Sequence, residues 1–399
     1  MRKIMALTLS LVMLFSVGCS GGGDSDKTET KESTASAGLS DSASASGDDT
    51  VKIGIVASLT HPTVATAGEY TKNGVAIAVE EINESGGILG KPLEVIWEDD
   101  AADATTHINA YNKMLENDVA GIVGTVFSSA TLAAASVVEE GGIPTTYGGS
   151  AASLGYTGVR NLFGQRPSNE ITAEAAAKFM LDEQNCKKVG ILYCTNDFAV
   201  GAKDVIVDYF DSVGADYEME AYNVGDTDFQ AQLIKLESSG CDGFIAWGDD
   251  NDLAIICRQV YEMGWDVPRM GSNGLASAQL QVDPEMANGW FVAGDFSPNN
   301  KDNKTTMAFA EKYMDRYGME IEIYSSVFYS GLKMFADVIN ECGSTDPEAI
   351  IDAIYQLEDY EAANGIYNCN EKGQLVNSAL ILECRDHTTE VLETVVVEN

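Results

Sequence analysis

The sequence predicts an α/β protein built from two doubly wound, Rossmann-like lobes that are joined by three crossover segments. Two observations carry this prediction. From residue 51 onward, short β-branched runs alternate with runs of helical hydrophobic period, which is typical of a parallel sheet covered by helices on both faces. The same alternation starts again near Glu170, after the connecting stretch LFGQRPSNE, and this repetition indicates a second lobe.

The first 50 residues lie outside the two predicted lobes. Residues 1–19 combine a basic start, an apolar run and small residues ahead of Cys19, a pattern that resembles a bacterial lipoprotein signal peptide whose cysteine becomes lipid-modified. An ordinary secretory signal that is cleaved nearby is the alternative. Residues 20–50 contain almost no large apolar side chains, so we expect a disordered tether. Both alternatives place the folded part outside the cytoplasm, and the lipoprotein signal also anchors it to the bacterial cell membrane.

The first lobe is predicted over residues 51–166 together with residues 298–364. Its strands are expected at 51–59, 93–100, 119–126 and 143–147, and its helices at 68–85, 105–117 and 130–140. The pair Gly86 and Gly87 ends the first of these helices. Longer helical runs at 303–317, 325–340 and 347–357 follow the second lobe, and we expect them to return to the first.

The second lobe is predicted over residues 167–297 together with residues 365–399. Helices at 171–183, 201–213, 228–239 and 253–263 alternate with strands at 188–194, 216–223, 242–248 and 268–273. Strand-like runs at 365–370, 378–384 and 390–397 close the chain. Ligands of parallel sheets bind beyond the carboxyl ends of the strands, so the cleft between the lobes is the expected ligand site.

Composition excludes several classes of function. Asp and Glu number 62 against 24 Lys and Arg, with a formal net charge of -38, so counterion release cannot drive binding to a nucleic acid. The chain lacks a G-x-S-x-G elbow, a P-loop and an H-E-x-x-H motif, so we expect no enzyme. The cysteines after Cys19 show no C-x-x-C pair and the histidines are scattered, so neither a metal nor another cofactor is predicted. We expect a monomer.

Several fragments, in order along the chain, resemble one family. They are VKIGIVASLT, KNGVAIAVEEINESGGILGKPLEV, EDDAAD, AGIVGTVFSSATLAAA, EEGGIPTTYGGSA, PSNE and DTDFQAQLIKLESSGCDGF, and together they are similar to the branched-chain amino-acid-binding family of ABC-transporter solute receptors. The resemblance implies a type I periplasmic-binding-protein fold whose lobes close on a small ligand by a hinge. It also implies delivery of that ligand to an ABC permease and its ATPase.

Ser128 and Ser129, in the stretch GTVFSSATLAAA, stand where a strand gives way to a helix. Hydroxyls beside the free N–H groups of a helix N-terminus suit a carboxylate. The resemblance implies that Ser128 and the loop of Gly149, Ser150 and Ala151 hold the α-carboxylate of the ligand. Ser150 is the available hydroxyl of this loop, because Ala151 replaces a threonine of the relatives. The alternative is that the two serines only cap the helix.

The second lobe is expected to contact the rest of the ligand. The resemblance assigns an aromatic side chain to the position of Phe198, which can cover an apolar or a cationic portion. Asn273 replaces a glutamate of the relatives, so the usual countercharge to an α-ammonium is missing there. Asp249 and Asp250 follow a predicted strand, and Asp250 is expected to supply this countercharge. The alternative for these acids is a solvated loop.

The sequence therefore predicts an extracytoplasmic, lipid-anchored receptor that captures an amino acid, of branched-chain type or a similar small carboxylate, and delivers it to a membrane permease. A receptor that senses a small amide or an organic acid without transport is one alternative. A hydrolase is another, which the missing catalytic motifs disfavour.

Overall fold

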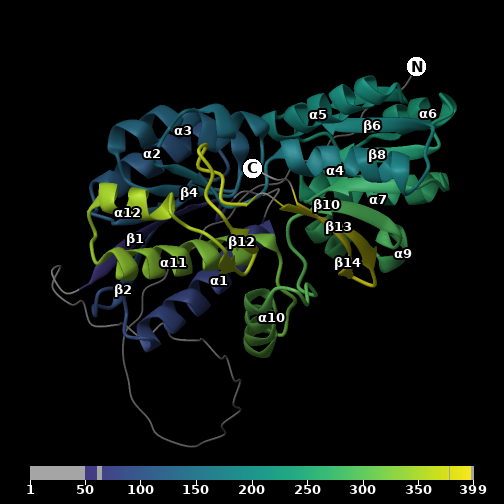
Figure 1. Cartoon of the computed structure of the whole chain (residues 1–399). Coiled ribbons are helices and arrows are strands. Elements are labelled where there is room, and N and C mark those ends of the chain that lie inside the picture. The colour runs from purple at the N-terminus through teal and green to yellow at the C-terminus, as the bar shows by residue number, and fades with distance from the viewer. Residues whose placement is uncertain (1–49, 61–64, 377, 397–399) are drawn as a thin grey trace, which may run out of the picture. The chain divides into compact units, whose positions relative to one another are not determined.

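The computed structural model describes residues 50–60, 65–376 and 378–396, all of which belong to one compact unit (Figure 1). The predicted signal peptide, Cys19 and nearly all of the predicted tether lie outside the described residues. Within the described ranges, no helix combines the length and the apolar character that crossing a membrane requires. The same ranges contain every cysteine after Cys19, and none of these cysteines forms a disulfide.

The first lobe contains a parallel sheet with the strand order β2-β1-β3-β4-β5. Its strands are β1 (Val51–Ala57), β2 (Leu93–Asp99), β3 (Gly121–Val123), β4 (Thr145–Tyr147) and β5 (Leu162–Gly164). Helices α2 (Ala104–Leu115) and α3 (Ser128–Gly141) pack together on one face, and α1 (Ala65–Glu84) and α11 (Ile323–Cys342) pack together on the other (Figure 1). Because helices cover both faces, β1 is apolar and buried along nearly its whole length.

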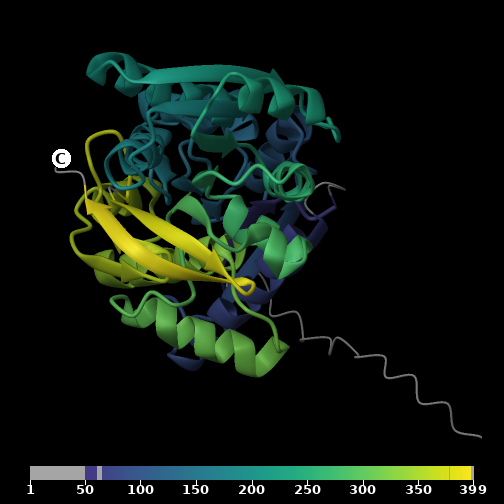
Figure 2. The same cartoon turned by 90° about the vertical axis from the view of Figure 1, so that its right-hand side faces the viewer.

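The second lobe contains a seven-stranded sheet with the order β14-β13-β10-β9-β8-β6-β7. Five neighbouring strands run parallel, namely β6 (Lys188–Cys194), β7 (Asp216–Tyr222), β8 (Gly243–Trp247), β9 (Arg269–Ser272) and β10 (Trp290–Gly294). The strands β13 (Ser378–Arg385) and β14 (Thr388–Val396) add a long antiparallel hairpin beside β10 (Figure 2).

The helices of the second lobe alternate with these strands as the sequence predicts. They are α4 (Asn169–Asp182), α5 (Asp197–Val213), α6 (Gln230–Ser238) and α7 (Asp250–Met263), followed by the short helices α8 (Leu275–Ala278) and α9 (Pro284–Ala287). Short 3₁₀ turns occur at Ala152–Tyr156 and Gln279–Gln281.

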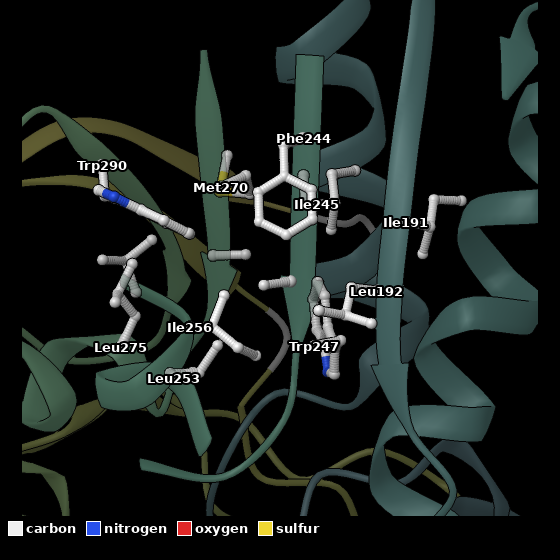
Figure 3. Packing of buried hydrophobic residues seen from close by; sticks show 14 of the residues in the cluster. Ile191, Leu192, Phe244, Ile245, Trp247, Leu253, Ile256, Met270, Leu275 and Trp290 are labelled. Atoms are coloured by element: carbon white, nitrogen blue, oxygen red, sulfur yellow. The ribbon is translucent and has the colours of Figure 1, made fainter. Parts of the chain in front are cut away.

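The core of the second lobe forms around β8 and β9. Leu253 and Ile256 of α7, Trp247 of β8 and Met270 of β9 all belong to its cluster of buried hydrophobic residues (Figure 3). Trp247 is fully buried, and its ring centroid lies 6.2 Å from that of Phe198. The indole therefore belongs to the core, and it supports the aromatic side chain that the sequence assigns to the cleft.

Both sheets reverse their strand order at the first strand of the lobe. β1 lies between β2 and β3, and β6 lies between β7 and β8, so the parallel parts of the two lobes share one topology. At such a reversal the neighbouring connections leave in opposite directions and open a crevice beyond the carboxyl ends of the strands. The loops after β3 and after β8 are thus placed to bind a ligand.

The chain returns to the first lobe with α10 (Lys304–Tyr317), α11 and α12 (Pro347–Ile354). The sequence predicts the last crossing between the lobes at residue 365, but the structure has it later. β12 (Gly365–Tyr367) pairs with β11 (Tyr360–Ala362), and Tyr367 and Val376 pack in the first-lobe core. The chain joins the second sheet at Ser378. The expectation fails because a strand-like run at 365–370 does not show which lobe the strand joins.

Three helices that border the cleft begin earlier than the sequence predicts. Helix α3 begins at Ser128 instead of residue 130, α5 at Asp197 instead of residue 201, and α7 at Asp250 instead of residue 253. Polar residues form the extra turn in α3 and α7, and a polar N-cap precedes it in α5. The side chain of Asn196 caps α5 by accepting from the backbone N–H of Ala199 at 2.9 Å. Four predicted ligand residues therefore lie on the first turns of helices, namely Ser128, Ser129, Phe198 and Asp250.

A buried ion pair joins two of the crossover segments. Arg166 lies between β5 and α4, and Asp295 follows β10. Nε of Arg166 donates to Oδ2 of Asp295 at 2.6 Å and Nη2 donates to Oδ1 at 3.2 Å, while Nη1 donates to the carbonyl of Gly148 at 3.1 Å. Both charged side chains are buried. Separating the two side chains would leave each as an uncompensated buried charge. The pair therefore holds the two crossover segments together.

The variant Asp295→Asn should destabilise the protein, because it leaves the buried Arg166 without a counterion. Loss of one partner of a buried pair costs about 3–5 kcal/mol in the free energy of unfolding, which urea titration measures. Glu390→Gln is the matched control, since it removes one negative charge from the exposed pair with Arg385 and should leave stability nearly unchanged. If the two variants changed the free energy of unfolding equally, the buried pair would stabilise the protein no more than the exposed pair does.

Candidate functional site

A cavity of about 260 Å³ lies between the two lobes, beyond the carboxyl ends of their strands. From the first lobe it is lined by Ala102 and Ala104 after β2, by residues 126–130 after β3, by Ser150 after β4, and by Ile323 and Tyr324 of α11. Pockets for drug-sized ligands hold roughly 300–1,000 Å³, so the volume indicates a smaller molecule.

The second lobe lines the same cavity with the residues that follow its own strands. Asn196 and Phe198 come after β6, residues 248–250 after β8, and Asn273 and Gly274 after β9. Of the residues that the sequence assigns to the ligand, Ser128, Ser129, Ser150, Phe198, Asp250 and Asn273 line the cavity. Gly149 and Ala151 do not line it. Their backbone atoms lie against the Ser128 side chain instead.

The first-lobe side of the cavity is the N-terminus of α3. The N-cap residue is Phe127, whose backbone is extended and whose side chain makes no cap. Ser128 and Ser129 are the first two helical residues, so the alternative that they only cap the helix is wrong. This turn lines the cavity and has no side-chain cap, and a helix N-terminus of this kind favours an anion.

The Ser128 hydroxyl is oriented by the loop after β4. Its Oγ accepts from the backbone N–H of Ser150 at 3.2 Å and of Ala151 at 3.1 Å. A Cβ atom on Gly149 would lie 2.9 Å from this Oγ, so the glycine permits the close approach. A hydroxyl has two acceptor sites and one hydrogen. Both acceptor sites of Ser128 are used, and its hydrogen has no acceptor among the described residues. The O–H can therefore donate to a ligand.

Ser150 adds a second hydroxyl on this side. Its side chain is almost fully buried and lines the cavity, yet it has no hydrogen-bond partner among the described residues. The hydroxyl is therefore free to bond a ligand that enters the cavity. Ser129 differs, because its hydroxyl donates to Oδ2 of Asp197 at 2.8 Å and thereby links the two lobes.

The second-lobe side carries two neighbouring carboxylates. Asp250 is 7% exposed, and both of its oxygens accept from the Tyr324 hydroxyl at 3.1 Å, which is a second link between the lobes. Burial raises the pKa of Asp250 to about 6. Asp249 accepts from Nδ2 of Asn196 at 3.1 Å, and burial, reinforced by the charges of its acidic neighbours, raises its pKa to about 7. The alternative of a solvated loop therefore does not hold for Asp250.

No free cation offsets these carboxylates within the cavity. Arg166 is the one basic side chain among the described lining residues, and its guanidinium is bound by Asp295. Burial is the main cause of the raised pKa values of Asp249 and Asp250, because it disfavours their charged forms. A ligand with a cationic group would stabilise their ionised forms.

Four polar lining residues were not foreseen as ligand residues. Tyr324 reaches the cavity from α11, far along the chain, and Arg166 reaches it from a crossover. Asn196 could have been recognised as a helix cap from its place before a helical run, but its bond to Asp249 depends on tertiary packing. Asp249 follows the same predicted strand as Asp250, but the sequence assigns no role of its own to it.

The wall formed by Ala102 is held by a buried network. Asp100 accepts from the backbone N–H of Ala102 at 2.9 Å, pairs with Nδ1 of His107 at 3.0 Å and accepts from the Ser58 hydroxyl. Ala101 and Ala102 have positive φ angles of 50° and 54°, which non-glycine residues adopt only at a cost. The network therefore fixes a strained loop at the edge of the cavity.

Comparisons with known proteins identify the family of this chain. A family model described as periplasmic binding protein matches residues 50–388. The chain is 27% identical over 334 residues to the leucine-, isoleucine-, valine-, threonine- and alanine-binding protein of Pseudomonas aeruginosa, covering 82% of this chain and 88% of that protein. It is also 27% identical to the Leu/Ile/Val-binding protein BraC3 of Rhizobium johnstonii, covering 83% and 90% of the two chains.

Solved structures share the fold. The leucine-binding protein LivK of Thermotoga maritima matches with a TM-score of 0.78 and 23% identity, covering 87% of this chain and 99% of that one. The substrate-binding protein LivJ of Streptococcus pneumoniae, solved with isoleucine, matches with a TM-score of 0.79 and 24% identity, covering 88% and 100%. Since the family model spans most of the sequence, the chain belongs to the periplasmic-binding-protein family, with the type I fold.

Proposed function

We propose that this protein is an extracytoplasmic solute receptor that captures an α-amino acid between its lobes and delivers it to the permease and ATPase of an ABC transporter. One observation carries the proposal, namely that the two sides of the cavity have opposite hydrogen-bonding character. The first lobe presents N–H and O–H donors, and the second presents carboxylates. A zwitterion matches both sides at once. The relatives support this reading, since their names assign them to amino acids.

The proposal assigns one role to each side. The ligand carboxylate accepts from the N-terminal N–H groups of α3 and from the hydroxyls of Ser128 and Ser150. The ligand ammonium donates to Asp250, whose burial makes an unpaired negative charge unfavourable. Val126, Phe127 and other apolar lining residues surround the remaining part of the ligand.

Capture is coupled to closure because the ligand groups bridge two lobes. Contacts already link the lobes at Ser129 with Asp197 and at Tyr324 with Asp250. A ligand bound to both sides adds its own bonds to these contacts and shifts the population toward the closed form. The permease then has a ligand-dependent shape to recognise.

Replacing either cavity hydroxyl should weaken binding. Ser128→Ala and Ser150→Ala each remove a charge-assisted hydrogen bond of about 1.5–3 kcal/mol, which corresponds to a roughly ten- to hundredfold loss of affinity in calorimetric titration. Ser212→Ala is the control, since Ser212 bonds only the carbonyl of Tyr209 on the exposed side of α5. Affinities that match the control in both cavity variants would place the ligand carboxylate elsewhere.

Asp250→Asn should weaken binding of an amino acid and leave its deaminated analogue nearly unaffected, because only the former presents a cation. Affinity of the unaltered protein for the amino acid should rise between pH 5 and pH 8. Asp250 has a pKa of about 6 without ligand, an ammonium favours its ionised form, and its proton must therefore leave on binding. An affinity that is flat over this range in calorimetry would argue against contact between the ammonium and Asp250.

We also propose that Cys19 carries the lipid that anchors the receptor to the membrane, a role that rests on the sequence pattern of residues 1–19. Cys19→Ala should release folded, ligand-binding protein from the membrane fraction, because the tether separates anchor and lobes. Fractionation after a salt wash, with Cys369→Ala as the control, measures this. Retention of the Cys19 variant in the membrane would contradict the anchor.

A further inference from the structure

The cavity holds one more carboxylate than the proposed zwitterion neutralises. Asp249 and Asp250 both line it, and a single α-ammonium compensates one negative charge. Arg166, the basic residue of the described cavity wall, already neutralises Asp295. The second carboxylate is therefore left without a counterion among the described residues.

Asp249 is the carboxylate that remains available. It precedes α7 as the N-cap residue, but its side chain makes no cap hydrogen bond. One of its oxygens accepts from Asn196, and no partner for the other oxygen is recorded in the described part of the chain. Burial and the negative charges of Asp252 and Asp250 raise its pKa to about 7, so its ionised form is poorly stabilised by the protein alone.

Asn273 gives an independent sign of a ligand group at this place. It is only 9% exposed, it lines the same cavity, and its side-chain amide has no hydrogen-bond partner among the described residues. The backbone of this turn is fixed, because the Asn273 carbonyl accepts from Ala276 at 3.2 Å. Because this amide has no partner in the described part of the protein, its oxygen can accept from a nitrogen of a ligand in the cavity.

We infer that the ligand is an amino acid whose side chain ends in a second cationic nitrogen, and that Asp249 and Asn273 receive this nitrogen. The inference rests on the proposed function, which directs the ligand carboxylate to α3 and the α-ammonium to Asp250. An ammonium has three donors, and the free oxygen of Asp249 and the amide oxygen of Asn273 are acceptors for them. A metal ion is a poorer match, since the described residues contain no group of three or more His, Cys, Asp or Glu arranged to hold one.

Two pairs of amino acids test this inference directly. L-lysine differs from L-norleucine, and L-ornithine from L-norvaline, by the terminal ammonium alone. Calorimetric titration at pH 8, in buffer with EDTA, should show at least one cationic member binding roughly ten- to a hundredfold tighter than its apolar partner, because a charge-assisted bond is gained. Equal or tighter binding of both apolar members would overturn the inference.

Variants of two aspartates of the same helix turn localise the effect. Asp249→Asn should abolish the preference for the cationic member and leave the apolar member bound as before. Asp252→Asn is the matched control, because this carboxylate binds the Tyr222 hydroxyl and does not line the cavity, and it should leave the preference intact. A preference that survives Asp249→Asn, or that disappears equally in the control, would refute the assignment.

The same titrations separate this inference from the proposed function. If the apolar amino acids bind in a manner that depends on Ser128 but the cationic ones gain nothing, the inference fails and the receptor proposal stands. If no α-amino acid binds, or if binding is indifferent to Ser128 and Ser150, both fail together.

Discussion

The guanidinium of Arg166 binds Asp295, and the polarity of the whole cleft depends on that pairing. The ion pair ties together the segments that leave β5 and β10. It also removes the one basic side chain of the described cavity wall from competition for Asp249 and Asp250. Had the guanidinium turned toward these acids, it would neutralise one of the two carboxylates and a cationic ligand would gain less there. Hinge stability and ligand chemistry are thus set by the same contact.

The opposite character of the two sides follows from topology and from the residues that end the strands. Each lobe opens a crevice where its strand order reverses, and each crevice is bordered by the N-terminus of a helix. In the first lobe this N-terminus is α3, whose first residues are serines that leave its donors free. In the second lobe it is α7, whose N-cap and first residue are aspartates. One architecture therefore presents donors on one side and acceptors on the other.

Closure uses groups that belong to the cavity itself. Tyr324 brings the N-terminus of α11 to Asp250, and Ser129 brings α3 to Asp197. The N-cap of α11 is Glu322, a buried carboxylate whose pKa burial raises to about 8. Three acids thus lie on or near the closing surface. A cation bound there relieves their mutual repulsion and favours the closed form, which links ligand charge to lobe movement.

The sequence by itself determined the alternation of strands and helices, the two lobes and the strand ends that carry Ser128 and Asp250. Hydrophobic periodicity and turn residues are local features, so they can be recognised without knowledge of the tertiary contacts. Helix starts shifted by two to four residues, because a cap is decided by a hydrogen bond such as that of Asn196 and not by periodicity alone.

Only the tertiary structure decided which polar groups meet. Tyr324 binds an aspartate 74 residues earlier in the chain, and Arg166 binds one 129 residues later. Neither pairing can be predicted from the local sequence. The same holds for residues 365–376, whose few large apolar side chains are compatible with either core. Such contacts depend on how the lobes pack, and burial then raises the pKa of a carboxylate such as Asp250, so that a cation bound beside it stabilises the ionised form.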